Sequence, residues 1–495
     1  MPRQLMKRKR TPNNNGNQRD ERKPKMKRAV VFPLSLPVRP DVPGRVLVCG
    51  QGDVGQLGLG DDESKLECKL PTLVEFAKNV VDVTAGGMHN LLLTEEGHVY
   101  SFGCNDEGAL GRDSNKDGSE FVPQKVDLPD KVLKISAGDS HSACLLEDGR
   151  VYAWGSFRDS HGSMGLTLDG IQRLPIDILP GIRCCDVASG ADHLVILSCM
   201  GKVYTLGCGE QGQLGRVSLR SASGEGRRGK VELLNPQQVI IKKRDAKLIE
   251  AIWATSYCTF LKESETGKIW TFGLNNYKQL ACPEDISPVS YPISINLDHV
   301  SQIAGGQHHT MLLKDDGIVR VVGRKEYGRL GLGPANEGAT ELTTISALTQ
   351  EGIVHISCGD AQSFASTSDG KVYAWGMGSS YQLGTGSEED ALEPTLIESM
   401  QTEGTRILKA SGGAQHTIFL AKNGIQLNDA KKVNVAGKKG KYIKSFGTSA
   451  KKKEENKRVA QEMAGKIEEK PEESPVAKKE SSAHVLGPST KTRRK

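Results

Sequence analysis

The sequence predicts an all-β protein: a seven-bladed β-propeller closed by pairing of its N- and C-terminal strands, with disordered basic tails. Three observations support this prediction. A glycine-rich motif recurs seven times, short apolar strands joined by tight turns stand between its copies, and the first and last repeats are each incomplete. We place the propeller at residues 45–425, between an N-terminal tail at 1–44 and a C-terminal tail at 426–495.

The recurring motif, here called the GQLG motif, sets the period of the array. Two of its versions read GQGDVGQLGLG (50–60) and GCGEQGQLGRV (207–217). The first glycines of the seven copies stand at positions 50, 103, 155, 207, 273, 323 and 376, which gives intervals of 53, 52, 52, 66, 50 and 53 residues. A period near 50 built from strands is typical of β-propellers, whereas helical repeats space their apolar residues at three and four positions.

Each repeat also contains a predicted β-hairpin. In HNLLLTEEGHVYSFG (89–103), an apolar strand reaches Glu96-Gly97 and returns as a second strand. A type I′ turn needs positive φ at both central positions, so Asp-Gly and Asn-Gly pairs between apolar strands are strong hairpin signals. Such pairs occupy the same place in four other repeats: Asp148-Gly149, Asp316-Gly317, Asp369-Gly370 and Asn423-Gly424.

The two ends of the array complement each other. The first copy begins RVLVCGQGDVGQLG (45–58) and lacks the strand that normally precedes it, whereas the last copy ends HTIFLAKNG (416–424) and lacks the GQLG motif that normally follows. Pairing HTIFL with RVLVC would close the ring and remove the exposed sheet edges of an open array.

Glycine-rich steps such as AGGMHN (85–90) precede the inner strands and let backbones approach near a crowded axis. One histidine recurs at most of these steps: His89, His141, His193, His308 and His416. Histidines spread around a ring do not converge on one ion at about 2 Å. We therefore interpret them as scaffold, and we expect neither a metal site nor a cofactor.

The net charge of +6 is unevenly distributed. Residues 1–30 contain 11 Lys and Arg against 2 acidic residues, and residues 428–495 contain 19 against 9, which leaves −13 for residues 31–427. Both tails lack sustained apolar periodicity, so we predict that they are disordered and bind DNA nonspecifically. The acidic body suits a basic partner. No apolar run reaches the roughly 18 residues of a membrane span, and we expect no membrane partner. The 11 cysteines are scattered and form no CxxC pair, which indicates reduced thiols.

Two basic clusters in the N-terminal tail match a bipartite nuclear-import signal. They are separated by about a dozen residues, as such signals require, and they predict a nuclear import receptor as partner and a nuclear location. A solvated charge run that aids solubility is the alternative. The basic residues of the two clusters are Lys7, Arg8, Lys9, Arg10, Arg22, Lys23, Lys25, Lys27 and Arg28.

Two segments depart from the repeat. WGSFRDSHGSMGL (154–166) is two residues longer than the other GQLG motifs and has Met164 in place of leucine. RVSLRSASGEGRRGKVELLNP (216–236) is a polar, basic insertion that accounts for the interval of 66 residues. In a repeat array the recurring residues build the blade, so the departing residues are free to take another role. The alternatives are an ordinary loop insertion in the first segment and a mobile solvated loop in the second.

Taken together, these motifs resemble the regulator of chromosome condensation family. The resemblance rests on GQGDVGQLGLG, AGGMH, YSFGCNDEGALGRD, WGSFRD and GGQHHT, and it covers about residues 45–425. Members of this family are chromatin-bound guanine-nucleotide exchange factors for the small GTPase Ran, and they generate Ran-GTP around chromosomes for nuclear transport, spindle assembly and nuclear envelope formation. The resemblance implies the same function here, without covalent chemistry.

The resemblance also implies which residues act on the GTPase. A β-wedge over residues 157–164 would push in beside the phosphate and Mg²⁺ site and stabilise the nucleotide-free GTPase. Asp192 is expected to bear on turnover and His308 on docking, although a turn-capping role is the neutral reading of an aspartate here. The implied contacts are Phe157, Arg158, Asp159, Ser160 and His161 in the wedge, and Asp192, His308, Asp139, Asp53 and His416 elsewhere.

A second set of residues is implied to bind chromatin. The 216–236 insertion stands where the family has a loop that meets the acidic patch of the nucleosome. Arginine suits such a surface because its planar guanidinium pairs with carboxylates in a bidentate manner. The implied histone contacts are Ser218, Arg220, Arg227 and Arg228.

Two other functions remain open at this point. A propeller scaffold that binds chromatin without exchange activity would have the same repeats, although it would have no reason to keep SFRD (156–159). An enzyme on the central axis would need convergent carboxylates or a Ser/His/Asp set, and a nucleotide hydrolase would need a P-loop. The sequence has ring-repeated histidines instead, and it lacks the GxxxxGK[ST] pattern.

Overall fold

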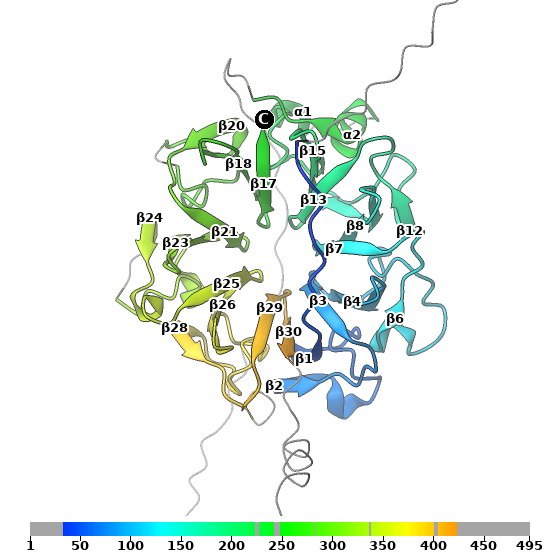
Figure 1. Cartoon of the computed structure of the whole chain (residues 1–495), viewed down its shortest axis with the longest axis vertical. Helices are drawn as coiled ribbons and strands as arrows, with labels where there is room; N and C mark the ends of the chain where they lie inside the picture. The colour runs from blue at the N-terminus through cyan, green and yellow to red at the C-terminus, as the bar shows by residue number, and fades with distance from the viewer. Residues whose placement is uncertain are drawn as a thin grey trace, which may run out of the picture. The chain divides into compact units, whose positions relative to one another are not determined.

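The computed structural model describes residues 33–222, 227–241, 248–282, 284–335, 338–399 and 404–422. The strands within these residues form seven four-stranded antiparallel blades around a central axis, and one further two-stranded hairpin (Figure 1). This arrangement confirms the predicted seven-bladed β-propeller. The import signals, the C-terminal tail and the Asn423-Gly424 turn lie outside the described residues.

Each blade begins with the strand nearest the axis. Blade 1 contains β3 (Val80–Ala85), β4 (His89–Thr94), β5 (Val99–Gly103) and β6 (Gln124–Lys125). Blade 2 contains β7 (Val132–Ala137), β8 (His141–Leu146), β9 (Val151–Gly155) and β12 (Gln172–Asp177). Blade 3 contains β13 (Cys184–Ser189), β14 (His193–Ser198), β15 (Val203–Gly207) and β16 (Gln237–Gln238). Blade 4 contains β17 (Ile249–Ala254), β18 (Cys258–Glu263), β19 (Ile269–Gly273) and β20 (Val289–Ile295). Blade 5 contains β21 (Val300–Gly305), β22 (His309–Lys314), β23 (Val319–Gly323) and β24 (Ala339–Thr344). Blade 6 contains β25 (Ile353–Cys358), β26 (Gln362–Thr367), β27 (Val372–Gly376) and β28 (Ala391–Leu396).

Blade 7 is built from both ends of the described chain. Its inner strands are β29 (Ile407–Gly412) and β30 (His416–Lys422), and its outer strands are β1 (Gly44–Gln51) and β2 (Glu67–Leu73). β1 pairs with β30 in an antiparallel ladder that runs from Gly44 opposite Lys422 to Gly50 opposite His416. The predicted pairing of RVLVC with HTIFL is therefore present.

The antiparallel blades give the ring two distinct faces. In each blade the first and third strands end, and the second begins, at the same edge, so the glycine-rich steps and the GQLG motifs share one face. We call this the motif face. The tight turns between the second and third strands, such as Glu96-Gly97, lie on the opposite face, which we call the turn face.

The GQLG motif recurs because it packs each blade against the next. Its leucine is buried, as Leu110 is. The following Gly111 has φ +65°, and a Cβ there would lie 2.6 Å from Nε1 of Trp154 in blade 2. The Trp154 indole N–H in turn donates to Ala109 O over 2.7 Å. A larger residue after the leucine would push the two blades apart.

The scaffold histidines link neighbouring blades. His89 Nε2 lies 2.8 Å from Ser142 Oγ in the next blade, and His193 Nε2 lies 2.9 Å from Thr259 Oγ1. In blade 5 the equivalent residue is His309, whose Nε2 lies 2.8 Å from Ser363 Oγ. The assignment of His308 to this recurring set is therefore wrong, because His309 begins strand β22 and His308 precedes it.

Part of the predicted N-terminal tail packs against the turn face. Residues 33–43 have no regular secondary structure, but the Leu34 N–H donates to Cys199 O in blade 3 over 3.1 Å. The Arg39 guanidinium donates to Val132 O and Glu95 O, each over 2.9 Å, and pairs with Glu147. This segment therefore connects blades 3, 2 and 1 before it enters β1 of blade 7.

Helices are short in the described part of the chain. The α-helices are α1 (Leu219–Ala222) and α2 (Arg227–Leu234), and the 3-10 helices are Glu63–Lys65, Ser119–Phe121, Glu326–Gly328 and Ser346–Leu348. A search of the described residues finds no helix with the length and apolar character that crossing a membrane requires.

We expect Gly111→Ala to lower the free energy of unfolding by about 2–4 kcal/mol, since it combines a left-handed φ with a clash against Trp154. The matched control is Gly267→Ala, where φ is +66° but a Cβ meets nothing within 4 Å. Backbone strain alone should cost the control about 1–2 kcal/mol. Urea unfolding of the full chain measures both, and equal losses would contradict the packing role of Gly111.

Candidate functional site

A backbone hydrogen bond occupies one equivalent position in every blade. The acceptor is the carbonyl oxygen of the residue just before the second strand, and the donor is the N–H of the residue after the first glycine of the GQLG motif. For example, the Cys208 N–H donates to Asp192 O over 2.7 Å, and the Arg324 N–H donates to His308 O over 2.9 Å. Because the backbone makes this bond, the side chain at the position can vary freely. The seven residues are Met88, Ser140, Asp192, Tyr257, His308, Ala361 and Gln415.

The departing motif of blade 2 folds as a hairpin of β10 (Phe157–Asp159) and β11 (Gly162–Gly165). The base of this 157–165 hairpin is buried: Phe157 is fully enclosed and packs edge-to-face on His141, with ring centroids 4.7 Å apart. Met164 is also buried. The expectation that Phe157 contacts a partner is therefore wrong, because its side chain anchors the hairpin in the core.

The tip of the hairpin is polar and open to solvent. Arg158, Ser160 and His161 are exposed, and Asp159 is half-buried. The structure thus separates the five predicted wedge residues into one apolar anchor and four residues that a partner could reach.

Asp192 contacts the hairpin directly. Its Oδ1 accepts a hydrogen bond from the Arg158 N–H over 2.8 Å. Burial, followed by the nearby charge of Asp139, raises the pKa of Asp192 to about 7, although the bond from Arg158 favours the ionised form. The site therefore contains a carboxyl group that changes charge near neutral pH.

Two further aspartates line the central channel on the motif face, Asp139 and Asp360. Asp139 is reached by solvent, yet the surrounding protein atoms raise its pKa. Burial and then the charge of Asp139 raise the pKa of Asp360 to about 6. Sequence reasoning missed Asp360, although CGDAQS (358–363) parallels AGDSHS (137–142) and could have indicated it.

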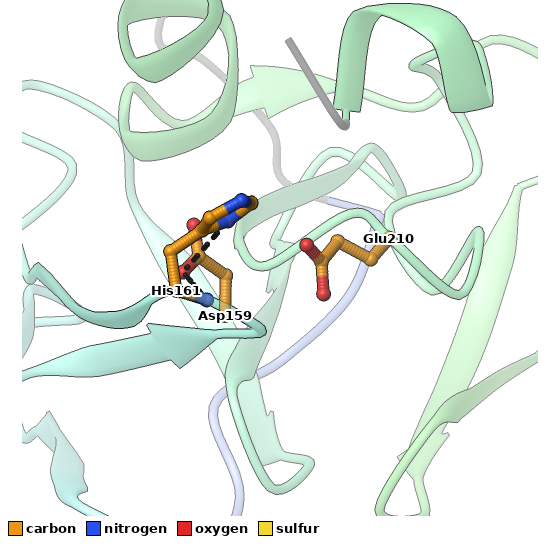
Figure 2. Close-up of side chains that lie close together, drawn as sticks. All are labelled: Asp159, His161 and Glu210. Carbon is orange, nitrogen blue, oxygen red and sulfur yellow. Dashed lines mark hydrogen bonds and ion pairs between the residues drawn. The ribbon is translucent and has the colours of Figure 1, made fainter. Parts of the chain in front are cut away.

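Asp159, His161 and Glu210 form a cluster at the hairpin tip, with one potential ligand atom of each residue within 4.8 Å of the others (Figure 2). Asp159 Oδ1 accepts the His161 N–H over 2.8 Å and lies 3.7 Å from His161 Nδ1. The two carboxylate oxygens of Glu210 accept from the N–H and hydroxyl of Ser160. Hydrogen bonds from the hairpin thus hold both carboxylates of the cluster in place.

His308 lies half-buried among aromatic rings. Its ring centroid is 5.4 Å from that of Tyr277 in an edge-to-face contact and 6.3 Å from that of Tyr257. Burial, followed by the charges of Arg329 and Arg324, lowers the pKa of His308, so the imidazole is neutral at pH 7. The two tyrosines were missed at the sequence level. The irregular step WATSYCTF (253–260), which contains Tyr257, was the available signal.

The remaining predicted contacts with the GTPase differ in their surroundings. His416 is fully buried, and its Nε2 lies 3.0 Å from Asn90 Oδ1 across the closure of the ring. The assignment of His416 to a contact surface is therefore wrong, and it belongs to the scaffold set. Asp53 is exposed in the GQLG motif of blade 7, on the motif face.

The 216–236 insertion contains both structural and exposed basic residues. Arg216 donates to Glu232 O over 2.7 Å and to Thr205 Oγ1 over 3.1 Å, so it ties the insertion to β15. The Ser218 hydroxyl accepts the Ser221 N–H over 3.3 Å in the first turn of α1, and Arg220 is exposed. The predicted contacts Arg227 and Arg228 begin α2, and the structure does not describe their side chains.

We expect the melting temperature of Asp192→Asn, relative to that of the unmodified protein, to rise as the pH increases from 5 to 8. The folded protein holds a proton on Asp192 up to about pH 7, whereas the unfolded chain loses it near 3.9. The raised pKa of Asp192 therefore stabilises the folded protein at low pH, and this stabilisation is lost as the pH rises from about 3.9 to about 7. Asparagine keeps an acceptor for the Arg158 N–H but cannot ionise. Thermal unfolding between pH 5 and 8 is the measurement, and the control is Asp169→Asn, which changes an exposed aspartate. A difference in melting temperature between Asp192→Asn and the unmodified protein that does not change with pH would refute the prediction.

Comparison with known proteins places the chain among close relatives. The family model for the RCC1-like domain matches residues 45–419. The chain is 58% identical over 414 residues to the regulator of chromosome condensation of Drosophila melanogaster, covering 83% of this chain and 75% of the relative. It is 47% identical over 393 residues to the human protein of the same name, covering 77% and 91%. It is 29% identical over 435 residues to the guanine nucleotide exchange factor SRM1 of Saccharomyces cerevisiae, covering 77% and 87%.

Two solved structures share the fold. The crystal structure of Prp20p from Saccharomyces cerevisiae, described with its binding properties to Gsp1p and histones, matches with a TM-score of 0.70 and 29% identity over 81% of this chain and 95% of that one. The structure of Kap60 bound to yeast RCC1 (Prp20) matches with a TM-score of 0.73 and 27% identity over 85% and 98%. With its seven blades, the lengthened GQLG motif of its blade 2 and these relatives, the chain belongs to the regulator of chromosome condensation family.

Proposed function

We propose that this protein is a guanine-nucleotide exchange factor for the small GTPase Ran that acts on chromatin in the nucleus. The observation that carries the proposal is the 157–165 hairpin, which is anchored in the core by Phe157 and exposes a polar tip on the motif face. The relatives support the activity, since SRM1 is named an exchange factor and Prp20p is described with Gsp1p and histones.

The hairpin is suited to exchange because exchange needs differential binding rather than covalent chemistry. Only contacts that are stronger in the nucleotide-release transition state than in the nucleotide-bound state accelerate release. An acceleration of about 10⁵-fold requires about 7 kcal/mol of such preference. A hairpin that is already fixed on a closed ring loses little conformational entropy on binding, so more of its contact energy is available.

The other residues of the motif face would dock the GTPase. Asp139 and Asp360 line the channel, and Asp192 lies within reach of the charge of Asp139. This group of acidic residues suits a basic partner surface and would accelerate encounter. His308 and Tyr277 add a partly exposed aromatic surface in blades 4 and 5. Asp53 lies on the same face and would make a supporting contact.

Chromatin binding would use other parts of the chain. Arg220, Arg227 and Arg228 of the insertion would pair with carboxylates of the nucleosome acidic patch, with Ser218 beside them. The basic tails would add phosphate contacts that raise affinity without reading sequence. Two basic clusters in the N-terminal tail would engage a nuclear import receptor, in line with the structure of Kap60 bound to yeast RCC1.

We expect substoichiometric amounts of this protein to release labelled GDP from Ran but not from unrelated small GTPases. Asp192→Ala should slow release by at least about tenfold, because the Arg158 N–H loses its acceptor. The control is Asp130→Ala, an exposed aspartate between blades 1 and 2. Absence of release by the unmodified protein would favour the alternative, a chromatin-binding scaffold without exchange activity.

We expect Arg220→Ala and Arg227→Ala to weaken nucleosome binding without changing GDP release, since both lie in the insertion and neither is among the residues proposed to contact the GTPase. Nucleosome affinity measured by gel shift and release measured by fluorescence should separate the two activities. A parallel fall of both activities would contradict the assignment of separate surfaces.

A further inference from the structure

The 157–165 hairpin is too small to fix its own orientation. β10 has three residues and β11 has four, and their register shifts between Phe157 and Arg158. Isolated two-stranded hairpins are marginally stable in water. The buried base anchors the hairpin to the blade, but the exposed tip has polar side chains only. The direction in which the tip points must therefore be set by polar contacts.

Those contacts come from the GQLG motifs of both neighbouring blades. On the blade 1 side, the Ser163 hydroxyl donates to Glu107 Oε2 over 2.8 Å, and Arg158 Nη1 lies 3.6 Å from Glu107 Oε1. On the blade 3 side, Glu210 Oε2 accepts the Ser160 N–H over 3.1 Å, and Glu210 Oε1 accepts the Ser160 hydroxyl over 2.6 Å.

We propose that Glu107 and Glu210 are positioning residues that clamp the hairpin from its two sides and so set the orientation that nucleotide exchange requires. Together with Asp192 beneath the hairpin, they supply three carboxylates from three separate segments of the chain. The consequence for exchange rests on the proposed function, whereas the clamp itself can be tested without any GTPase.

The chemistry of the clamp explains why these residues are acids. The hairpin directs N–H and O–H donors outward on both sides, and charge-assisted hydrogen bonds to carboxylates are about twice as strong as neutral ones. Glu107 is also largely shielded, with its side chain 19% exposed, so water competes less for these bonds. A purely structural role in the blades would not require either carboxylate to face the hairpin.

The conservative variants give a graded test. Glu107→Gln keeps an oxygen for the Ser163 hydroxyl but loses the charge near Arg158, and Glu210→Gln keeps one of two acceptor oxygens for Ser160. Glu107→Ala and Glu210→Ala remove both the charge and every acceptor oxygen of the side chain. The matched control is Asp113→Ala, which removes an exposed carboxylate from the blade 1 motif without touching the hairpin.

The first measurement is hydrogen–deuterium exchange of peptides that cover residues 156–166 in the full-length protein. We expect about tenfold faster exchange in Glu210→Ala and in the Glu107→Ala/Glu210→Ala double variant, a smaller change in the glutamine variants, and no change in the control or in peptides from the blades. Unchanged protection of the hairpin in the double variant would overturn the clamp.

The second measurement is GDP release from Ran by the same variants, resolved into kcat and KM. We expect kcat to fall about tenfold in Glu210→Ala, partial rescue by Glu210→Gln, and unchanged melting temperatures. Faster hydrogen exchange in the hairpin with normal GDP release would support the clamp and overturn the proposed action of the hairpin. A fall in kcat without any change in hairpin protection would overturn the clamp and leave the proposed function standing.

Discussion

The pairing of β1 with β30 is the constraint on which the rest of the structure depends. It joins the two ends of the described chain in one ladder and completes blade 7 from two pairs of strands that are far apart in sequence. A closed ring leaves no inner edge free, so each blade is held between two others. The site on the motif face uses this rigidity, because residues from blades 1, 2 and 3 meet around the hairpin.

The ring separates the recurring scaffold residues from the residues that we propose to contact the GTPase. Scaffold contacts use backbone groups and side chains that recur, such as His89, His193 and His309 with hydroxyl partners in the next blade. Because the carbonyl group before each second strand makes the recurring backbone bond, a change of the side chain there costs the fold little. Asp192 and His308 stand at this position in blades 3 and 5.

The sequence was sufficient for the periodic part of this architecture. Blades, turns and closure follow from a 50-residue period and from two incomplete ends, since each blade repeats one local pattern. The position of the hairpin was also found, because an insertion interrupts the period; that this segment forms a β-wedge was implied only by the family resemblance. The packing of residues 33–43 on the turn face was not foreseen, since LSLPVRP (34–40) has no strand or helix periodicity.

Side-chain orientation was the part that could not be predicted. Phe157 and His416 were expected at a contact surface, and both are buried, because burial depends on neighbouring blades rather than on local pattern. Glu107 and Glu210 were missed, since the hairpin residues that they contact lie in another repeat. Such contacts between blades carry no signal within a single repeat, so only the three-dimensional arrangement identifies them.

The central claim is that the hairpin drives nucleotide release from a rigid support. The most direct measurement replaces SFRDSHGSMG (156–165) by CGEQGQLG, the regular motif at 208–215, and follows GDP release from Ran. The regular motif should restore an ordinary blade, so the melting temperature and circular dichroism spectrum should stay close to those of the unmodified protein. We expect release to fall to the uncatalysed rate; release at the original rate by this folded variant would contradict the account.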